Sequence, residues 1–272
     1  MSPSIQRSIA TVEQWLAFHK YFEFLVSALD RAPQVHATGH FDTIIAAKFV
    51  DASAAAAALP DGVTLVADER TPSGQHPLLL ALGAQSDVKV LGEGPLHYGE
   101  TIIGVPNVSV DGFEDKGLAM YVSRIAVDHP LAWLLGKFIG LPKDLDMIHA
   151  GADDYSVRTL LARELVLSET SQTTTDPKMP ADFPNFAYVE SLLQQPIVSV
   201  DLGAFLFITF QWHFLDAQLQ GANSRLHVPS DLPALPAGDY SFEGFEKEVM
   251  GAGRLQVDWD LRGPFFEWPP PA

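Results

Sequence analysis

Short apolar runs separated by Gly, Pro and Asp residues dominate the chain between residues 33 and 265. Runs of this kind, bounded by turn-forming residues, are typical of β-strands. They predict strands over residues 43–45, 62–67, 87–91, 101–105, 118–127, 197–214, 225–228 and 255–259. Many strands at modest spacing predict a β-rich sheet or barrel.

The first 32 residues follow a different pattern, with apolar residues at the spacing of one helix face. Thr11 and Gln14 are placed as a capping box at the start of the segment. Its apolar positions are Val12, Trp15, Leu16, Phe22, Leu25, Val26 and Leu29. We therefore expect a helical extension over residues 1–32, one domain over residues 33–265 and an extended, Pro-rich tail over residues 266–272.

Within the predicted domain, helices are expected over residues 52–59, 130–139 and 153–164. The first contains a run of five alanines, which are strong helix formers, and it ends at Pro60-Asp61-Gly62. Residues 168–184 are polar and include three prolines. They predict a long surface loop, with the alternative that this loop covers a pocket.

Composition narrows the class of function. The 272 residues carry 17 Lys and Arg against 34 Asp and Glu, a formal net charge of -17. This balance argues against nucleic acid or an anionic membrane as a partner, because both attract positive surfaces. The absence of cysteine excludes disulfides and thiolate catalysis. Because residues 202–210 are too few to span a bilayer and the N-terminus lacks the apolar stretch of a secretory signal, we expect a cytoplasmic protein.

Among so few cations, Lys143 stands out by its surroundings. It follows Pro142 and an almost wholly apolar segment, residues 131–141. Apolar surroundings disfavour the charged form of an amine, and a neutral lysine amine is a nucleophile. Lys143 is therefore the leading candidate for a catalytic residue, and the alternative is a structural lysine paired with Asp144, Asp146 or Glu100.

The residues around this lysine resemble a known family. Asp128-His129-Pro130, Gly136-Lys137 and Gly140-Leu141-Pro142-Lys143 follow one another here. This order resembles the active-site segment of the acetoacetate decarboxylase superfamily, in which the lysine after the proline forms a Schiff base. Three more segments in the family's order resemble it too: residues 96–101 with Ile103 and Pro106, residues 184–186, and residues 221–226.

The resemblance covers roughly residues 41–262 and implies an α+β, β-rich fold. In that fold an antiparallel sheet or cone-shaped barrel encloses a cavity. The implied catalytic residues are Lys143 and Glu100, which lies on the segment similar to the family's glutamate-bearing strand. Neither a cofactor nor a metal is expected. The residues expected to bind substrate are Trp133, Phe138, Leu141, Asp144 and His40.

The family chemistry implies a small β-keto or polyketide-type substrate. An iminium on Lys143 would act as an electron sink for decarboxylation, or for aldol, dehydration or cyclisation steps. The chain departs from the family at Asp144, where the family has a second lysine, and an anion there favours the ammonium form of its neighbour. The family's arginine and second glutamate also lack a match, and Gly136 precedes the lysine by seven residues rather than eight.

Two other interpretations remain open at this point. One is a repurposed member of the fold that performs hydrolytic or lactone-forming acid–base chemistry with His40, Asp42, Glu100 or Asp144. The other is a non-catalytic carrier of a small ligand, with Lys143 as a countercharge. His36, His40 and Asp42 carry groups that bind metals or act as bases, although loop histidines of this kind are more often unliganded. The sequence leaves open whether the chain forms a homo-oligomer.

Overall fold

The computed structural model describes residues 35–90, 92–138, 140–160, 164–201 and 204–267. The described residues from His36 to Glu267 belong to one compact unit. The expected helical extension over residues 1–32 and most of the expected tail lie outside the described residues, so both stay predictions.

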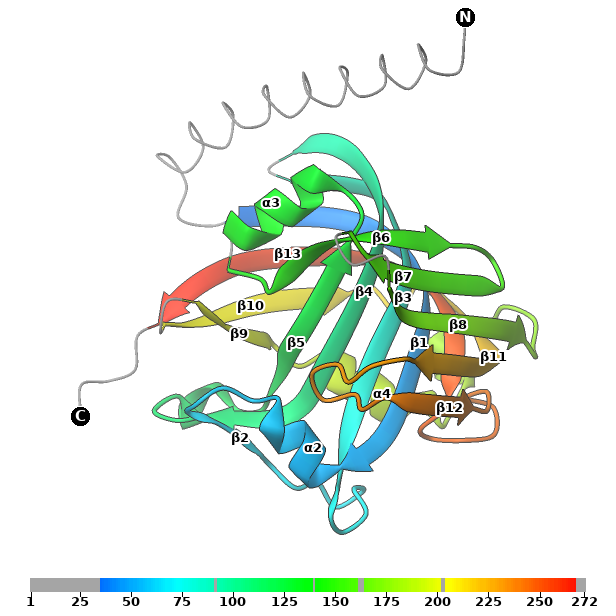
Figure 1. Cartoon of the computed structure of the whole chain (residues 1–272), viewed down its shortest axis with the longest axis horizontal. Coiled ribbons are helices and arrows are strands. Elements are labelled where there is room, and N and C mark those ends of the chain that lie inside the picture. The colour runs from blue at the N-terminus through cyan, green and yellow to red at the C-terminus, as the bar shows by residue number, and fades with distance from the viewer. Residues whose placement is uncertain (1–34, 91, 139, 161–163, 202–203, 268–272) are drawn as a thin grey trace, which may run out of the picture. The chain divides into compact units, whose positions relative to one another are not determined.

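The described residues of this unit form one large sheet, as expected (Figure 1). Its strand order is β12-β11-β8-β7-β6-β5-β9-β10-β13-β1-β3-β4-β2. The strands are β1 (Val35–Asp51), β2 (Val63–Leu65), β3 (Gln75–Val90), β4 (Glu93–Val110), β5 (Ala119–Val127), β6 (Lys143–Ala150), β7 (Asp154–Thr159), β8 (Leu165–Thr173), β9 (Ile197–Asp201), β10 (Ala204–Trp212), β11 (Gln218–Val228), β12 (Gly238–Phe242) and β13 (Ala252–Glu267).

Additional pairings fold this sheet back on itself. β4 pairs with β5, which joins β5, β9, β10, β13, β1, β3 and β4 into a ring, and β11 pairs with β13. The strand pairs with a described register are antiparallel, except that β5 runs parallel to both β6 and β9. Parallel neighbours need a crossover connection. Helix α3 (Pro130–Phe138) provides it between β5 and β6.

The long strands β3 and β4 form a wall with two different sides. Paired residues of neighbouring strands point to the same side of a sheet, and successive residues point to opposite sides. Glu100 pairs with Gly83, and Thr101 pairs with Leu82. We call the side that carries Glu100 the lysine side. The side that carries Thr101, whose hydroxyl lies 2.7 Å from the hydroxyl of Tyr155, is called the tyrosine side.

Both sides of the wall are packed with apolar residues. On the tyrosine side a buried cluster joins residues of β3 and β4 to residues of β7, β8 and β11, including Leu80, Leu82, Ile103, Val157, Leu167 and Leu226. On the lysine side the rings of Phe41, Phe210, Trp212 and Trp259 lie in contact. The molecule therefore has an apolar layer on each side of one shared wall.

The sequence predicted two of the helices. Helix α2 (Ala52–Ala57) and α3 lie within the predicted segments. Helix α4 (Phe186–Leu193) and the short 3-10 turns η1 (Glu114–Lys116) and η2 (Pro180–Asp182) were not anticipated.

The expected helix over residues 153–164 is wrong, because residues 154–159 form β7. There Tyr155 and Val157 are buried and alternate with polar residues, a period of two that belongs to a strand. The expected loop over residues 168–184 is wrong in its first part, which is β8. The polar residues Glu169 and Ser171 of β8 point inward and are buried, so the usual apolar strand signal is missing there.

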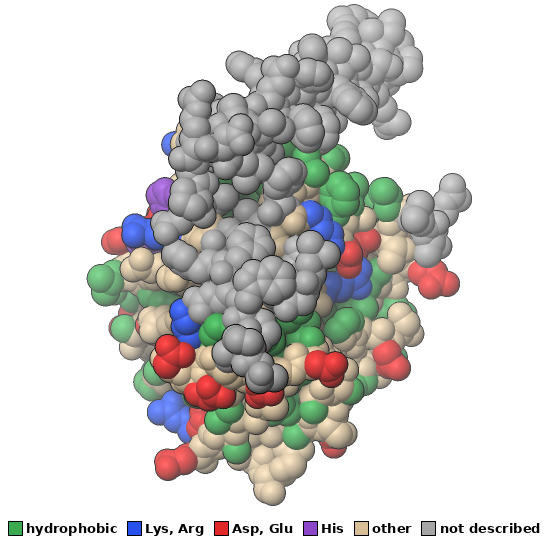
Figure 2. Space-filling view, turned by 90° about the vertical axis from the view of Figure 1, so that its left-hand side faces the viewer, with side chains coloured by type: hydrophobic (Ala, Val, Ile, Leu, Met, Phe, Trp, Pro, Cys, Tyr) green, Lys and Arg blue, Asp and Glu red, His purple; other side chains and the backbone are tan. Residues whose placement is uncertain are grey.

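No helix among the described residues is long and apolar enough to cross a membrane. On the face drawn in Figure 2, acidic side chains of the described residues are spread among polar and apolar ones.

The tyrosine-side cluster gives a stability prediction. Leu167→Ala removes a side chain that is 1% exposed and should destabilise the protein by about 2–5 kcal/mol, through lost apolar burial and the cavity left behind. Urea unfolding measures this change. Leu215→Ala is the matched control because Leu215 is 85% exposed, and its unfolding midpoint should stay where it is. Equal effects at both positions would contradict the described packing.

Candidate active site

Lys143 is positioned by the turn that ends α3. The amide of Gly140 donates to the carbonyl of Lys137, and the amide of Leu141 donates to the carbonyl of Gly136. These are the two hydrogen bonds of a Schellman motif, and Gly140 has the positive φ of 75° that the motif requires. Pro142 then stops the helical path, and Lys143 begins β6 beside Ile125 of β5.

Helix α3 passes directly over the lysine stem at Gly136. A Cβ atom at Gly136 would overlap the Lys143 side chain at Cδ, Cε and Cγ. Only glycine allows the helix backbone to approach so closely. The lysine stem is therefore enclosed, and Lys143 as a whole is 6% exposed.

The amine of Lys143 forms a buried ion pair with Glu100, the other predicted catalytic residue. Nζ lies 2.8 Å from Oε1 of Glu100, which is 4% exposed. The second carboxylate oxygen, Oε2, accepts a 2.7 Å hydrogen bond from Nε2 of Gln85. The indole N–H of Trp259 donates to Oε1 of Gln85 at 2.8 Å. Four strands thus contribute to one buried polar row.

Apolar and aromatic groups enclose this row. The Tyr98 ring lies beside the amine, with Nζ 5.4 Å from its centroid. Burial raises the pKa of the Tyr98 hydroxyl well above its usual value, and the charges of Glu100 and Asp128 raise it further. The hydroxyl therefore stays protonated and neutral near the ion pair.

A small apolar cavity of about 30 Å³ lies on the same side of β4. Ile102, two residues beyond Glu100 on that strand, is one of its lining residues, and Phe210 and Trp212 are others. Phe210 stacks against Trp259, with ring centroids 5.0 Å apart. The polar row is thus bordered by a largely apolar chamber, in which charges interact more strongly than in water.

Asp144 is turned away from the lysine. Because successive strand residues alternate, its side chain leaves the opposite side of β6 and is 54% exposed. Its carboxylate lies 3.3 Å from Nε of Arg124, and the same guanidinium binds Asp146 at 2.7 Å. This placement does not support the expectation that Asp144 contributes to the substrate site, and it keeps that negative charge paired with an arginine.

His40 lies in an open pocket of about 420 Å³ outside Trp259. Its Nδ1 lies 2.8 Å from Oδ1 of Asp258. Nearby, hydrogen bonds from His36 and then His213 hold the pKa of Asp260 below its usual value, against the effect of burial. Trp259 lies between this pocket and the polar row, because it lines the pocket and its indole N–H donates to Gln85.

The other predicted binding residues lie on or just after α3. Leu141 is buried, at 6% exposure, beside the lysine in sequence, and Trp133 is half-buried on the helix. The side chain of Phe138 lies outside the described residues. Their roles toward a substrate stay predictions.

The structure does not bring together the residues that the hydrolytic alternative needs. Asp42 is bound by Arg254 through two hydrogen bonds, of 2.9 and 2.7 Å. His40 pairs with Asp258, and Asp144 pairs with Arg124. Among the residues described, no group of three His, Cys, Asp or Glu side chains is arranged to hold a metal ion.

Sequence reasoning missed Tyr98, Gln85 and Trp259. Tyr98 had a usable signal, because a residue two positions before Glu100 on a strand shares its side of the sheet. Gln85 and Trp259 had none, since they lie 174 positions apart and only the folded sheet places Trp259 against Gln85 and Gln85 against Glu100.

Chemically, the site offers one amine and one carboxylate in direct contact. A proton can move between Nζ of Lys143 and Oε1 of Glu100 along their hydrogen bond. This movement would convert the ion pair into a neutral amine, which is a nucleophile, and a neutral acid, which is a proton donor.

No protein-family model matches the chain, and no curated protein matches it by sequence. Solved structures do match. An acetoacetate decarboxylase-like enzyme from Sphingomonas wittichii RW1 has a TM-score of 0.58 and 10% identity, covering 88% of this chain and 95% of that one. The enduracididine biosynthesis enzyme MppR, complexed with the condensation product of pyruvate and imidazole 4-carboxaldehyde, has a TM-score of 0.54 and 16% identity, covering 86% and 89%.

An acetoacetate decarboxylase also matches, with a TM-score of 0.50, 14% identity and coverage of 88% of this chain and 91% of that one. Likeness at such identities shows the fold. The chain adopts the acetoacetate decarboxylase-like fold, as the residues around Lys143 predicted.

The buried ion pair gives a second stability prediction. Lys143→Met leaves the Glu100 carboxylate buried without its cation, which should cost about 3–5 kcal/mol in urea unfolding. Adding Glu100→Gln removes the stranded charge and should restore most of the loss. In the exposed pair of Lys247 with Glu243, the control Lys247→Met should leave the midpoint unchanged. A Lys143→Met protein as stable as the wild type would contradict the described ion pair.

Proposed function

We propose that the chain is an acetoacetate decarboxylase-like enzyme that acts on the carbonyl group of a small metabolite through a Schiff base on Lys143. The observation that carries the proposal is the enclosed contact between Lys143 and Glu100, 2.8 Å long, with both residues under 10% exposed. The fold shared with acetoacetate decarboxylase-like enzymes adds support.

The reaction begins when Glu100 takes a proton from Lys143. The neutral amine attacks the carbonyl carbon of the substrate, and Glu100 returns its proton to the departing oxygen, which leaves as water. The net change replaces the ammonium by an iminium and releases one water molecule. Glu100 therefore ends as a carboxylate beside a cation, as it began, and the buried site keeps its charge balance throughout.

The iminium then serves as an electron sink. It accepts the electron pair left on the neighbouring carbon when that carbon loses a proton or carbon dioxide. Glu100 is within reach to remove or return the proton, because it already contacts the nitrogen. The hydrogen bond from Gln85 fixes the second carboxylate oxygen, so the proton exchanges at Oε1.

Within this scheme, the charges of the site favour a neutral carbonyl compound over a keto acid. Arg124 is engaged with Asp144 and Asp146, on the side of β6 away from the lysine. The pocket outside Trp259 is lined by Asp87, Asp216, Asp258 and Asp260, and its basic residues are Lys89, His40 and His213. We propose that substrate enters from this pocket, where the acidic rim would repel a carboxylate. Aldol, dehydration or cyclisation steps through the iminium therefore fit better than decarboxylation.

Reduction with borohydride tests the Schiff base. The wild-type protein is incubated with 2,4-pentanedione, a neutral diketone, or with acetoacetate, its anionic counterpart, and is then reduced and digested. Mass spectrometry should find the adduct on the peptide that contains Lys143, with more adduct from the diketone. Lys143→Arg should abolish it.

Two controls separate this reaction from surface labelling. Lys137→Arg replaces an exposed lysine on α3 and should leave the Lys143 adduct intact. Asp144→Asn should also leave it intact, because that carboxylate faces Arg124. Adducts spread evenly over exposed lysines, with Lys143 unmodified, would overturn the Schiff-base proposal.

A further inference from the structure

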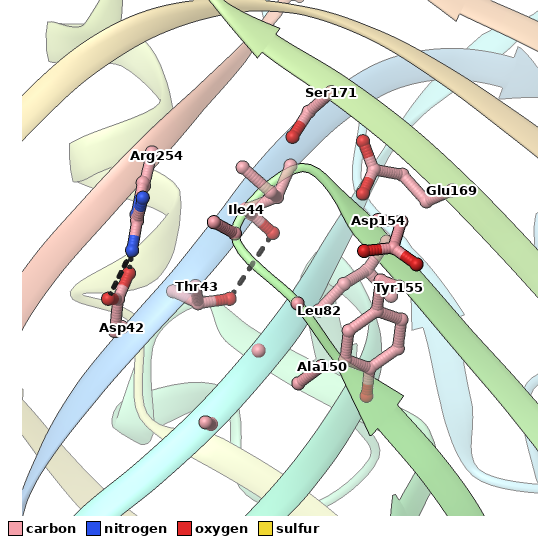
Figure 3. Close-up of a pocket in the computed structure, with 14 residues that line it drawn as sticks. Asp42, Thr43, Ile44, Leu82, Ala150, Asp154, Tyr155, Glu169, Ser171 and Arg254 are labelled. Atoms are coloured by element: carbon pink, nitrogen blue, oxygen red, sulfur yellow. Dashed lines mark hydrogen bonds and ion pairs between the residues drawn. The ribbon is translucent and has the colours of Figure 1, made fainter.

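A second polar pocket, of about 190 Å³, lies on the tyrosine side of the β3–β4 wall (Figure 3). Asp42 of β1 and Arg254 of β13 lie on one side of it. Asp154 and Glu169, from β7 and β8, lie on the other. The pocket is thus built between the wall and the outer strands.

This pocket is separate from the site of Lys143. Leu82, which lines it, pairs with Thr101, whose hydroxyl contacts Tyr155 in the pocket lining. Glu100 is the neighbour of Thr101 and points to the other side of the same strand. One layer of sheet therefore stands between the two sites.

Glu169 gives the pocket a buried carboxyl group in a fixed position. The residue is 3% exposed, and its Oε1 accepts a 2.6 Å hydrogen bond from the hydroxyl of Ser224, itself 2% exposed. Burial raises the pKa of Glu169 to about 7, although hydrogen bonds from Ser224 and Ser171 act in the opposite direction. A carboxyl group in such surroundings gains from a cationic partner.

The other charged residues that line the pocket do not provide Glu169 with a cationic partner. Burial alone would raise the pKa of Asp42, but hydrogen bonds from Arg254 and Gln256 outweigh it and hold that pKa below its usual value. Asp42 and Arg254 therefore neutralise each other. Asp154 adds a second carboxylate near Glu169, and its partner is His149 at 3.1 Å, where both side chains are 63% exposed.

The lining also offers an apolar surface, from Ile44, Leu82 and Ala150. The volume of about 190 Å³ equals roughly six waters at about 30 Å³ each. It is below the range of about 300–1,000 Å³ that is typical for drug-sized ligands. A short ligand with one charged end and one alkyl end matches both the size and the lining.

We propose that this pocket binds a small organic cation, a protonated primary amine with a short alkyl chain. The ammonium group lies between Glu169 and Asp154, and the alkyl chain lies against Ile44 and Leu82. This site is distinct from the Schiff-base site and does not depend on the proposed reaction.

Binding should depend on pH through Glu169. With a pKa of about 7, roughly one tenth of the carboxyl groups are ionised at pH 6 and nine tenths at pH 8. A primary amine stays protonated over this range, since its pKa is about 10. Affinity for the cation should therefore rise by up to about tenfold from pH 6 to pH 8.

The other charged or titratable groups that line this pocket are Asp42, Asp154, Tyr155 and Arg254. Arg225, His227 and Asp239 line a neighbouring pocket that Glu169 also borders. His149 is the hydrogen-bond partner of Asp154, so its contribution is removed in a separate variant. The titration is therefore repeated in a His149→Gln background, in which the rise should persist.

Propylammonium is the probe, and 1-propanol is its neutral counterpart of similar size. Full-length protein is titrated with each at pH 6, 7 and 8 and followed by amide chemical shifts in NMR spectra. Propylammonium should move the amide signals of residues 150–155 and 169–171. Its dissociation constant should be at least tenfold lower than that of 1-propanol. Glu169→Gln should weaken binding at pH 8 about tenfold and remove the pH dependence.

Matched variants keep this test decisive. Glu190→Gln makes the same change on α4 and should bind as the wild type does. Asp154→Asn, an exposed position, should also weaken binding and serves if Glu169→Gln fails to fold. The Lys143→Met/Glu100→Gln variant should retain binding, which separates this site from the proposed reaction. Equal binding of both probes, or unchanged affinity in Glu169→Gln or Asp154→Asn, would overturn the proposal.

Discussion

The contact between Lys143 and Glu100 is the interaction on which the candidate active site depends. The two residues are 43 positions apart and lie on β6 and β4, which are separated in the sheet by β5. The ion pair therefore bridges a whole strand. Removing two charges from water costs several kcal/mol for each ion, and this cost is offset only when geometry and hydrogen bonding are good. Gln85 and Trp259 supply that hydrogen bonding, so they position the carboxylate rather than react.

The backbone around α3 allows Lys143 to be enclosed and to point toward Glu100. Gly136 lets the helix cover the lysine stem, and Gly140 turns the chain so that Lys143 enters β6 facing inward. The same strand alternation sends Asp144 outward to Arg124. Asp144, where the chain departs from the family pattern, therefore places its negative charge next to Arg124 on the side of β6 away from Lys143.

Much of this arrangement follows from local sequence, and the rest does not. The apolar segment before Lys143, the helix over α3 and the β-rich class were predictable, because each rests on neighbouring residues. Strand β8 was not, since Glu169 and Ser171 are buried polar residues, and Glu169 accepts its hydrogen bond from Ser224 of β11, 55 positions away. The roles of Gln85 and Trp259 were equally unpredictable, because they depend on contacts among Glu100, Gln85 and Trp259 that only the folded sheet creates.

Strand β4 contributes side chains to two different polar sites, one on each side of the β3–β4 wall. Glu100 and Thr101 are adjacent in sequence, yet one meets an amine within an aromatic chamber and the other meets Tyr155 beside a pocket of carboxylates. Burial raises the pKa of Tyr155 strongly, and the charges of Glu100 and Asp128 act in the same direction. The pKa of Tyr155 therefore depends in part on Glu100, which lies on the other side of the sheet. Glu100 contributes to the pKa of Tyr155 across a single layer of backbone, so the wall separates the two cavities sterically while their charges stay within electrostatic range of each other.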